Sequence, residues 1–137
     1  MADVIVLDTS WVVALRDPRD AHHRRAVETS REIAEENAAL HPVTLAECLV
    51  APARLGVLKE AAAALRASFS VVDVDPDAPL RWARLRTTTG LRLPDCIVLD
   101  TALHLGARAV ATFDDKLASR AVGRGLEVLG TTASVET

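Results

Sequence analysis

The sequence predicts an α/β fold of three layers, in which a central parallel β-sheet of four to five strands carries helices on both faces. Short apolar runs of the kind that buried parallel strands require occur at 4–7 (VIVL), 70–74 (SVVDV) and 109–112 (AVAT), with a weaker run at 127–129 (EVL). Longer segments with helical periodicity separate these runs, and strands that alternate with helices are typical of a parallel sheet.

The expected helices fill most of the chain between the strands. They span 9–16, 21–37, 43–51, 57–67, 77–87, 94–106 and 115–124. Pro52 is expected to end or kink the helix that begins near Val43, because proline lacks the backbone N–H that a helix interior needs. No repeat, linker or low-complexity run divides the 137 residues, so we expect a single domain over 1–137 with a frayed tail at 130–137.

The composition limits the classes of function. A formal net charge of −3 gives no global positive field for nucleic acid, and 3% aromatic residues give no platform for stacking bases. Cys48 and Cys96 lack metal-site spacing and are interpreted as reduced, buried thiols. No basic leader precedes the first apolar run, and no stretch approaches the roughly 20 apolar residues of a membrane helix. We therefore expect a cytoplasmic protein without a membrane segment.

The stretch 93–104 (LPDCIVLDTALH) places two aspartates on an otherwise apolar helix. On a helical wheel that starts at Asp95, Asp100 falls at about 140°, beside Thr101 and His104. These three residues form one polar stripe, in which Asp100 and His104 are four residues apart and can touch. Asp100 is therefore expected to be a solvated surface residue. Asp95 points inward, where a carboxylate is costly unless it is paired.

Four acidic residues each have an ordinary structural explanation. Asp8 and Asp114 follow strands and could be helix N-caps. Thr44 and Glu47 fit a capping box, and Asp95 would favourably meet a helix dipole in a first turn.

Considered together, the four carboxylates indicate a site. Asp8 and Asp114 lie at the carboxyl ends of two strands, where ligands bind in an open α/β sheet, and Asp95 is aimed toward the same crevice. Converging carboxylates repel one another unless cations join them, and hard oxygen donors favour Mg²⁺ or Mn²⁺. A carboxylate-lined two-metal site is one established way to hydrolyse a phosphodiester.

The order of these motifs resembles the PIN-domain family and, more narrowly, the VapC toxins of bacterial toxin–antitoxin pairs. The resemblance rests on LDTS near the start, TLAE ending at Glu47, LPDCIVLDTAL and ATFDDKLA, and it covers about Val4 to Leu129. It implies a PIN-like fold and a metal-dependent endoribonuclease, usually a homodimer, that acts on tRNA or ribosomal RNA and is held inactive by a VapB-type antitoxin.

The resemblance also implies roles for individual residues. Asp8, Glu47, Asp95 and Asp114 match the catalytic acidic quartet of the family. Asp8 and Asp95 would be direct ligands of the main ion, and Asp114 would complete that site or hold a second ion. Glu47 would act as a ligand or through a bound water.

Further positions in the same motifs have supporting roles in this comparison. Ser10 and Thr112 occupy positions where the family often carries a small polar residue beside the cluster. Asp115 could help to hold the second ion, although a surface role is favoured. Asp100 departs from the family pattern, which more often has a small apolar residue there.

Other polar residues give weaker indications. His22 and His23 point about 100° apart on a helix, so a solvated first turn is a better interpretation than a metal site. Arginines cluster in two places that could bind phosphates or could form solvated faces: Arg16, Arg19, Arg24 and Arg25, and then Arg81, Arg84, Arg86 and Arg92. Trp11 and Trp82 are expected in the core.

The residues disfavour two rival functions and leave a third open. A receiver domain needs an acidic pair after the first strand and a phosphorylated aspartate in mid-chain, but no aspartate lies between Asp20 and Asp73. A haloacid-dehalogenase phosphatase needs a second aspartate two residues after Asp8, where the chain has Ser10. A catalytically inactive PIN-like module that binds RNA or protein remains the alternative.

Overall fold

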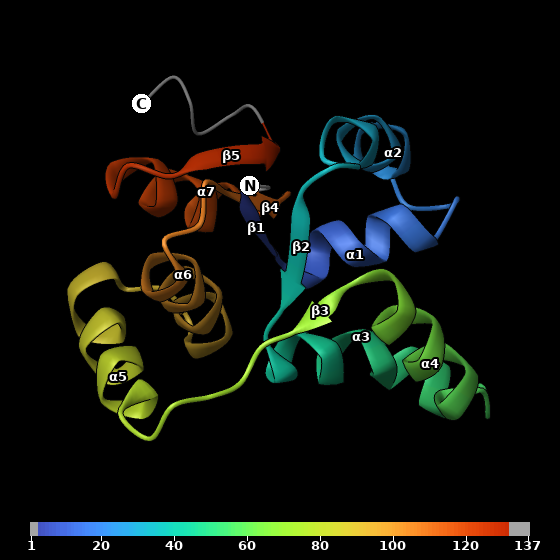
Figure 1. Cartoon of the computed structure of the whole chain (residues 1–137), viewed down its shortest axis with the longest axis horizontal. Coiled ribbons are helices and arrows are strands. Elements are labelled where there is room, and N and C mark those ends of the chain that lie inside the picture. Colours follow the sequence, from blue (N-terminus) through green and yellow to red (C-terminus); the bar gives the residue numbers. More distant parts are fainter. Residues whose placement is uncertain (1–2, 132–137) are drawn as a thin grey trace.

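The computed structural model describes residues 3–131, which form a five-stranded, wholly parallel sheet (Figure 1). The strands are β1 (Val4–Leu7), β2 (Asn37–Leu40), β3 (Ser70–Val71), β4 (Ala109–Thr112) and β5 (Glu127–Gly130). Their order across the sheet is β3-β2-β1-β4-β5, and every neighbouring pair is parallel. The predicted central parallel sheet is therefore confirmed, with β1 in the middle.

The described residues also contain the seven expected helices. They are α1 (Thr9–Arg16), α2 (His23–Glu32), α3 (Pro42–Arg54), α4 (Leu58–Ser68), α5 (Ala78–Thr89), α6 (Leu93–Leu105) and α7 (Asp115–Gly123). None of these helices is both long and apolar enough to cross a bilayer.

The alternation of side chains along the central strands divides the core into two halves. Ile5 and Leu7 of β1 face a cluster contributed by α1 to α4, whereas Val6 faces a cluster contributed by α5 to α7. All three side chains are fully buried. The two groups of helices lie on opposite faces of the sheet, as the predicted three layers require (Figure 1).

The second strand is the main element that the sequence pattern did not predict. The expected helix over 21–37 is wrong at its end, because α2 stops at Glu32 and β2 begins at Asn37. The run NAAL contains no β-branched or aromatic residue, so its strand propensity is low. It becomes a strand because it pairs with β1 on one side and β3 on the other.

Other boundaries also differ from the expected ones, most clearly at β3, at the end of α3 and at the end of β5. β3 covers only Ser70–Val71, because its partner β2 ends at Leu40 and the chain then enters α3. Helix α3 continues two residues beyond Pro52 to Arg54. β5 extends to Gly130, the first residue of the expected tail, whereas residues 132–137 lie outside the described part.

The strand order creates a switch point between β1 and β4. The chain moves outward from β1 through β2 to β3 and then returns to β4 on the other side of β1. The connection after β1 runs through α1 and α2 on one face, and the connection into β4 runs through α5 and α6 on the other (Figure 1). Ligands in open α/β sheets bind in the crevice outside the carboxyl ends of such strands.

Candidate active site

The four predicted site residues come from four different elements around this crevice. Asp8 follows β1 and Asp114 follows β4, and these two strands are adjacent and parallel. Asp95 lies in the first turn of α6, and Glu47 lies in the first half of α3. Asp8 and Asp95 are both buried, Asp114 is partly buried and Glu47 is exposed.

The Asp8 carboxylate is held by two hydroxyl groups and does not cap a helix. Ser10 Oγ and Thr112 Oγ1 both donate to Asp8 Oδ2, at 2.6 and 2.8 Å. Asp8 occupies the N-cap position of α1 without a side-chain cap hydrogen bond, so the capping interpretation is wrong for this residue. The supporting positions of Ser10 and Thr112 are confirmed as direct contacts. The arrangement keeps one Asp8 oxygen engaged and leaves Oδ1 without a hydrogen bond among the described residues.

The hydroxyl groups also connect the ends of β1 and β4. Ser10 Oγ accepts a hydrogen bond from the Phe113 N–H (3.0 Å), and Thr112 Oγ1 accepts one from the Asp114 N–H (3.0 Å). Gly130 packs closely behind this connection with φ at +126°, and a Cβ atom there would lie 2.2 Å from the Thr112 carbonyl oxygen. A side chain at Gly130 would therefore displace the backbone that orients Asp8 and Asp114.

Asp114 combines a structural contact with a position at the crevice. Its Oδ1 accepts a hydrogen bond from the Leu117 N–H at 2.9 Å, so the predicted N-cap of α7 is confirmed. Asp115, the next residue, accepts a hydrogen bond from Thr131 Oγ1.

Glu47 is oriented by a threonine that the sequence analysis did not single out. Thr9 Oγ1 donates to Glu47 Oε1 at 2.7 Å. The predicted capping box is wrong, because α3 begins earlier and its N-cap is His41, whose Nδ1 accepts a hydrogen bond from the Val43 N–H. Thr9 belongs to the LDTS motif, so its hydroxyl beside Asp8 was the available indication of a supporting role.

Asp95 is influenced both by burial and by the charges of the other three acids. Burial raises its pKa to about 6, with further increases from the negative charges of Asp114, Asp8 and Glu47. Arg92 opposes these effects through an ion pair of 3.7 Å, but its side chain is 79% exposed. The inward aim of Asp95 is thus confirmed, and its strongest neighbours are other carboxylates.

The donor set fits a hard divalent cation by its chemistry. Carboxylate oxygens are the ligands that Mg²⁺ and Mn²⁺ prefer, and a cation would relieve the repulsion that raises the Asp95 pKa. Within residues 3–131, however, no three histidine, cysteine, aspartate or glutamate side chains are close enough together to hold a metal ion.

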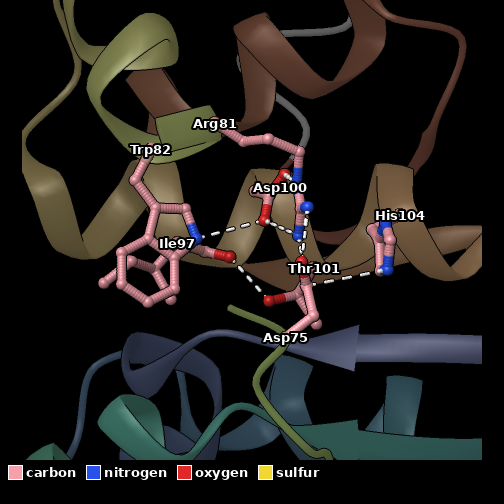
Figure 2. Close-up of polar contacts among 7 residues, drawn as sticks. All are labelled: Asp75, Arg81, Trp82, Ile97, Asp100, Thr101 and His104. Atoms are coloured by element: carbon pink, nitrogen blue, oxygen red, sulfur yellow. Dashed lines mark hydrogen bonds and ion pairs between the residues drawn. The ribbon is translucent and has the colours of Figure 1, made fainter. Parts of the chain in front are cut away.

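Asp100 contradicts its expected place on the solvated face. It is 6% exposed, and Arg81 donates to it from Nε (2.8 Å) and Nη2 (3.2 Å). Trp82 Nε1 also donates to Asp100, at 3.1 Å. Figure 2 shows Arg81 extending from α5 toward both Asp100 and Asp75. The helical wheel placed Asp100 away from Asp95 correctly, but α5 covers that side of α6.

The same cluster corrects two further expectations. His104 lies 3.8 Å from Asp75, in place of the expected contact with Asp100 (Figure 2). Arg81 makes two short hydrogen bonds to Asp75, at 2.6 and 2.9 Å, and lowers the pKa of that carboxyl to about 2. Trp82 is only partly buried and acts as a hydrogen-bond donor, whereas Trp11 lies in the core as predicted.

His22, His23 and the two cysteines are engaged in packing or local contacts. His22 stacks on Phe113 with 4.4 Å between ring centroids, and His23 Nδ1 lies 2.8 Å from the Ala14 carbonyl oxygen. Cys96 is buried as expected, whereas Cys48 is only half-buried. Burial raises the pKa of the Cys48 thiol to about 11, so it is not a thiolate at neutral pH.

A family model and several solved structures match this chain. The PIN domain family model matches residues 5–123. A toxin–antitoxin complex from Klebsiella pneumoniae superposes with a TM-score of 0.69 at 24% identity, covering 83% of this chain and 89% of that one. VapC20 from Mycobacterium tuberculosis, described as a sarcin–ricin loop cleaving toxin, superposes with a TM-score of 0.69 at 22% identity and covers 85% of this chain and 94% of that one.

A third structure supports the same fold. VapBC-1 from nontypeable Haemophilus influenzae gives a TM-score of 0.68 at 17% identity and covers 91% of this chain and 96% of that one. A search of curated protein sequences found no match.

Proposed function

Because the chain belongs to the PIN domain family, we propose that it is a metal-dependent endoribonuclease and the toxin of a VapBC-type toxin–antitoxin pair. The observation that carries the proposal is the set of four carboxylates at the switch point of the sheet. The pKa of Asp95 responds to the charges of the other three, so the four acids lie within electrostatic reach of one another. Structural similarity to VapC toxins supports the assignment to this class.

In this proposal Asp8, Asp95 and Asp114 hold Mg²⁺ or Mn²⁺, and Glu47 acts as a ligand or through a water. The ion would supply activation of a water molecule and stabilisation of the leaving oxygen of a phosphodiester. Ser10 and Thr112 donate hydrogen bonds to Asp8 Oδ2, which leaves Asp8 Oδ1 available as a ligand for the ion. Thr9 positions Glu47 in the same manner.

Purified protein should cleave RNA with Mg²⁺ or Mn²⁺ and lose this activity in excess EDTA. Asp8→Asn and Asp95→Asn should each abolish cleavage, whereas Glu60→Gln, a charge change on the exposed side of α4, should not. Undiminished cleavage in EDTA would contradict the metal mechanism. An absence of cleavage together with retained RNA binding would instead favour the alternative, a catalytically inactive PIN-like binding module.

The proposed partner is a VapB-type antitoxin that covers exposed apolar side chains in the first half of the chain. Val13 on α1, Val50 on α3, and Leu55, Val57 and Leu58 around the α3–α4 turn are 40 to 78% exposed. An arginine or lysine of the antitoxin would reach the carboxylates and take the place of the ion. Co-purification should fail with Leu55→Ser, and an affinity unaffected by Asp8→Asn would contradict the cationic contact.

The proposed toxin has an expected oligomeric state and cellular compartment. We expect a homodimer, which light scattering of the purified protein would test. A toxin whose targets are tRNA or ribosomal RNA would act in the cytoplasm.

A further inference from the structure

Two segments of the chain carry positive charges without any acidic residue. Residues 78–94 and 116–126 contain seven of the 16 lysines and arginines and none of the 19 acidic residues. The chain has a formal net charge of −3, so the rest of the molecule is strongly acidic. The two segments contain most of α5 and α7, which flank α6 on one face of the sheet (Figure 1).

A groove of about 470 Å³ lies where these three helices meet. Arg84 and Thr88 of α5 line it from one side, Leu103 and His104 of α6 from another, and Arg124 closes it after α7. Arg84, Thr88, His104 and Arg124 are exposed, so their polar groups are accessible. The groove therefore combines two guanidinium groups, an imidazole and a hydroxyl.

The two arginines of the groove are free of internal partners. Arg81, which also borders the groove, is committed to Asp75 and Asp100 (Figure 2). Asp100 is the only acidic residue that lines the groove within residues 3–131, and Arg81 and Trp82 already satisfy it. Arg84 and Arg124 make no ion pair or side-chain hydrogen bond within the described residues. The groove thus presents uncompensated positive charge.

We propose that this groove binds a phosphate of the RNA backbone at a distance from the point of cleavage, an inference that rests on the proposed function. Guanidinium groups bind phosphate through paired N–H donors, and phosphate contacts hold a nucleic acid in register. His104 is nine residues after Asp95 on α6, about 14 Å along the helix axis. The groove and the acidic site therefore occupy different parts of the same helix.

A polyanion is a better occupant than a single carboxylate of a peptide. The same two segments carry four further cations, all exposed: Arg86, Arg92, Lys116 and Arg120. The acidic site repels a phosphate backbone, so a strand needs attraction elsewhere on the molecule. Arg92 stands at the beginning of α6, 3.7 Å from Asp95, so an exposed cation is also present at the acidic end of the same helix.

The test is binding of a fluorescein-labelled single-stranded RNA by anisotropy in EDTA, across a range of salt concentrations. The double variant Arg84→Gln/Arg124→Gln should weaken binding about 10-fold and reduce the salt slope by about 0.7, which is the contribution of one single-strand phosphate contact. The matched control is Arg31→Gln/Arg54→Gln, which removes the same charge from exposed positions outside the groove and should change neither quantity by as much.

Each outcome distinguishes this inference from the proposed function. Cleavage by the wild type, with equal affinity and slope in groove and control variants, would overturn the groove and leave the nuclease intact. Absence of any RNA binding or cleavage by the wild type would overturn both. Unchanged RNA binding with weakened binding of poly-glutamate would show a peptide site and overturn the RNA assignment. Arg84→Lys/Arg124→Lys should restore most of the slope, and thermal melting should show that all the variants fold.

Discussion

Asp95 and Asp100 lie on the same helix with nearly equal exposure, 7% and 6%, yet their surroundings are opposite. Asp100 is compensated by a guanidinium and an indole N–H. Asp95 has carboxylates as neighbours and one loosely placed arginine, and its pKa is raised to about 6. Burial alone therefore does not distinguish a structural carboxylate from a functional one. The difference lies in whether the fold itself supplies the opposite charge.

The largest expected effect is on RNA cleavage, which should distinguish Asp95 from Asp100. Asp95→Asn should reduce RNA cleavage by at least about 10³-fold, because it removes a proposed metal ligand from the site. Asp100→Asn, assayed well below its melting temperature, should keep activity within a few-fold of the wild type. If Asp100→Asn abolished cleavage while Asp95→Asn did not, the location of the site would be wrong.

The next effect is on stability and reverses the expectation from the sequence for Asp100. A solvated Asp100 would change the free energy of unfolding by no more than about 0.5 kcal/mol when replaced. The buried pair with Arg81 implies that Asp100→Ala costs about 3 kcal/mol in denaturant unfolding, because it leaves a partly buried cation with one partner fewer. Asp75→Asn, at a carboxylate whose side chain is 36% exposed, is the control and should cost clearly less than Asp100→Ala, because solvent screens its pair with Arg81. Equal small costs at both positions would contradict the structural role of Asp100.

Replacement of Asp95 should have the opposite sign. The native protein binds the Asp95 proton more tightly than the unfolded chain does, since the native pKa is about 6 and the unfolded value is about 3.9. Native stability is therefore lost as pH rises from about 4 to about 6, and the full cost is present above pH 6. Asp95→Asn should stabilise the metal-free protein by about 2 kcal/mol at pH 7 and by little at pH 4.

Thermal melting across this pH range checks the prediction. Asp73→Asn, at an exposed position, should show no such pH-dependent gain. A destabilised Asp95→Asn protein at pH 7 would mean that the carboxylate has a compensating partner.

The smallest effect is the response to metal. Mg²⁺ or Mn²⁺ at ten times its dissociation constant should stabilise the wild type by about 1.4 kcal/mol, because the ion binds only the native site. The gain should be largely lost in Asp95→Asn and retained in Asp100→Asn. Equal gains in all three proteins would place the ion elsewhere.

Local periodicity was enough to predict the framework of the fold. The apolar runs VIVL and AVAT became β1 and β4 with the expected bounds, and the helix expected at 9–16 is α1. Such runs are buried on both faces and alternate with amphipathic segments, so the pattern carries the information by itself. Asp8 and Asp114 follow directly, because the residues after two parallel strands share one edge of the sheet.

Only the tertiary structure decided which polar residues have partners. NAAL became β2 because strands lie on both of its sides, and Glu47 is oriented by Thr9 from another helix. The helical wheel gave the direction of Asp100 from the backbone geometry of α6 alone. Whether Asp100 met water or Arg81 depended on how α5 packs against α6. Packing between two segments does not change the hydrophobic periodicity of either segment, so the sequence pattern could not show it.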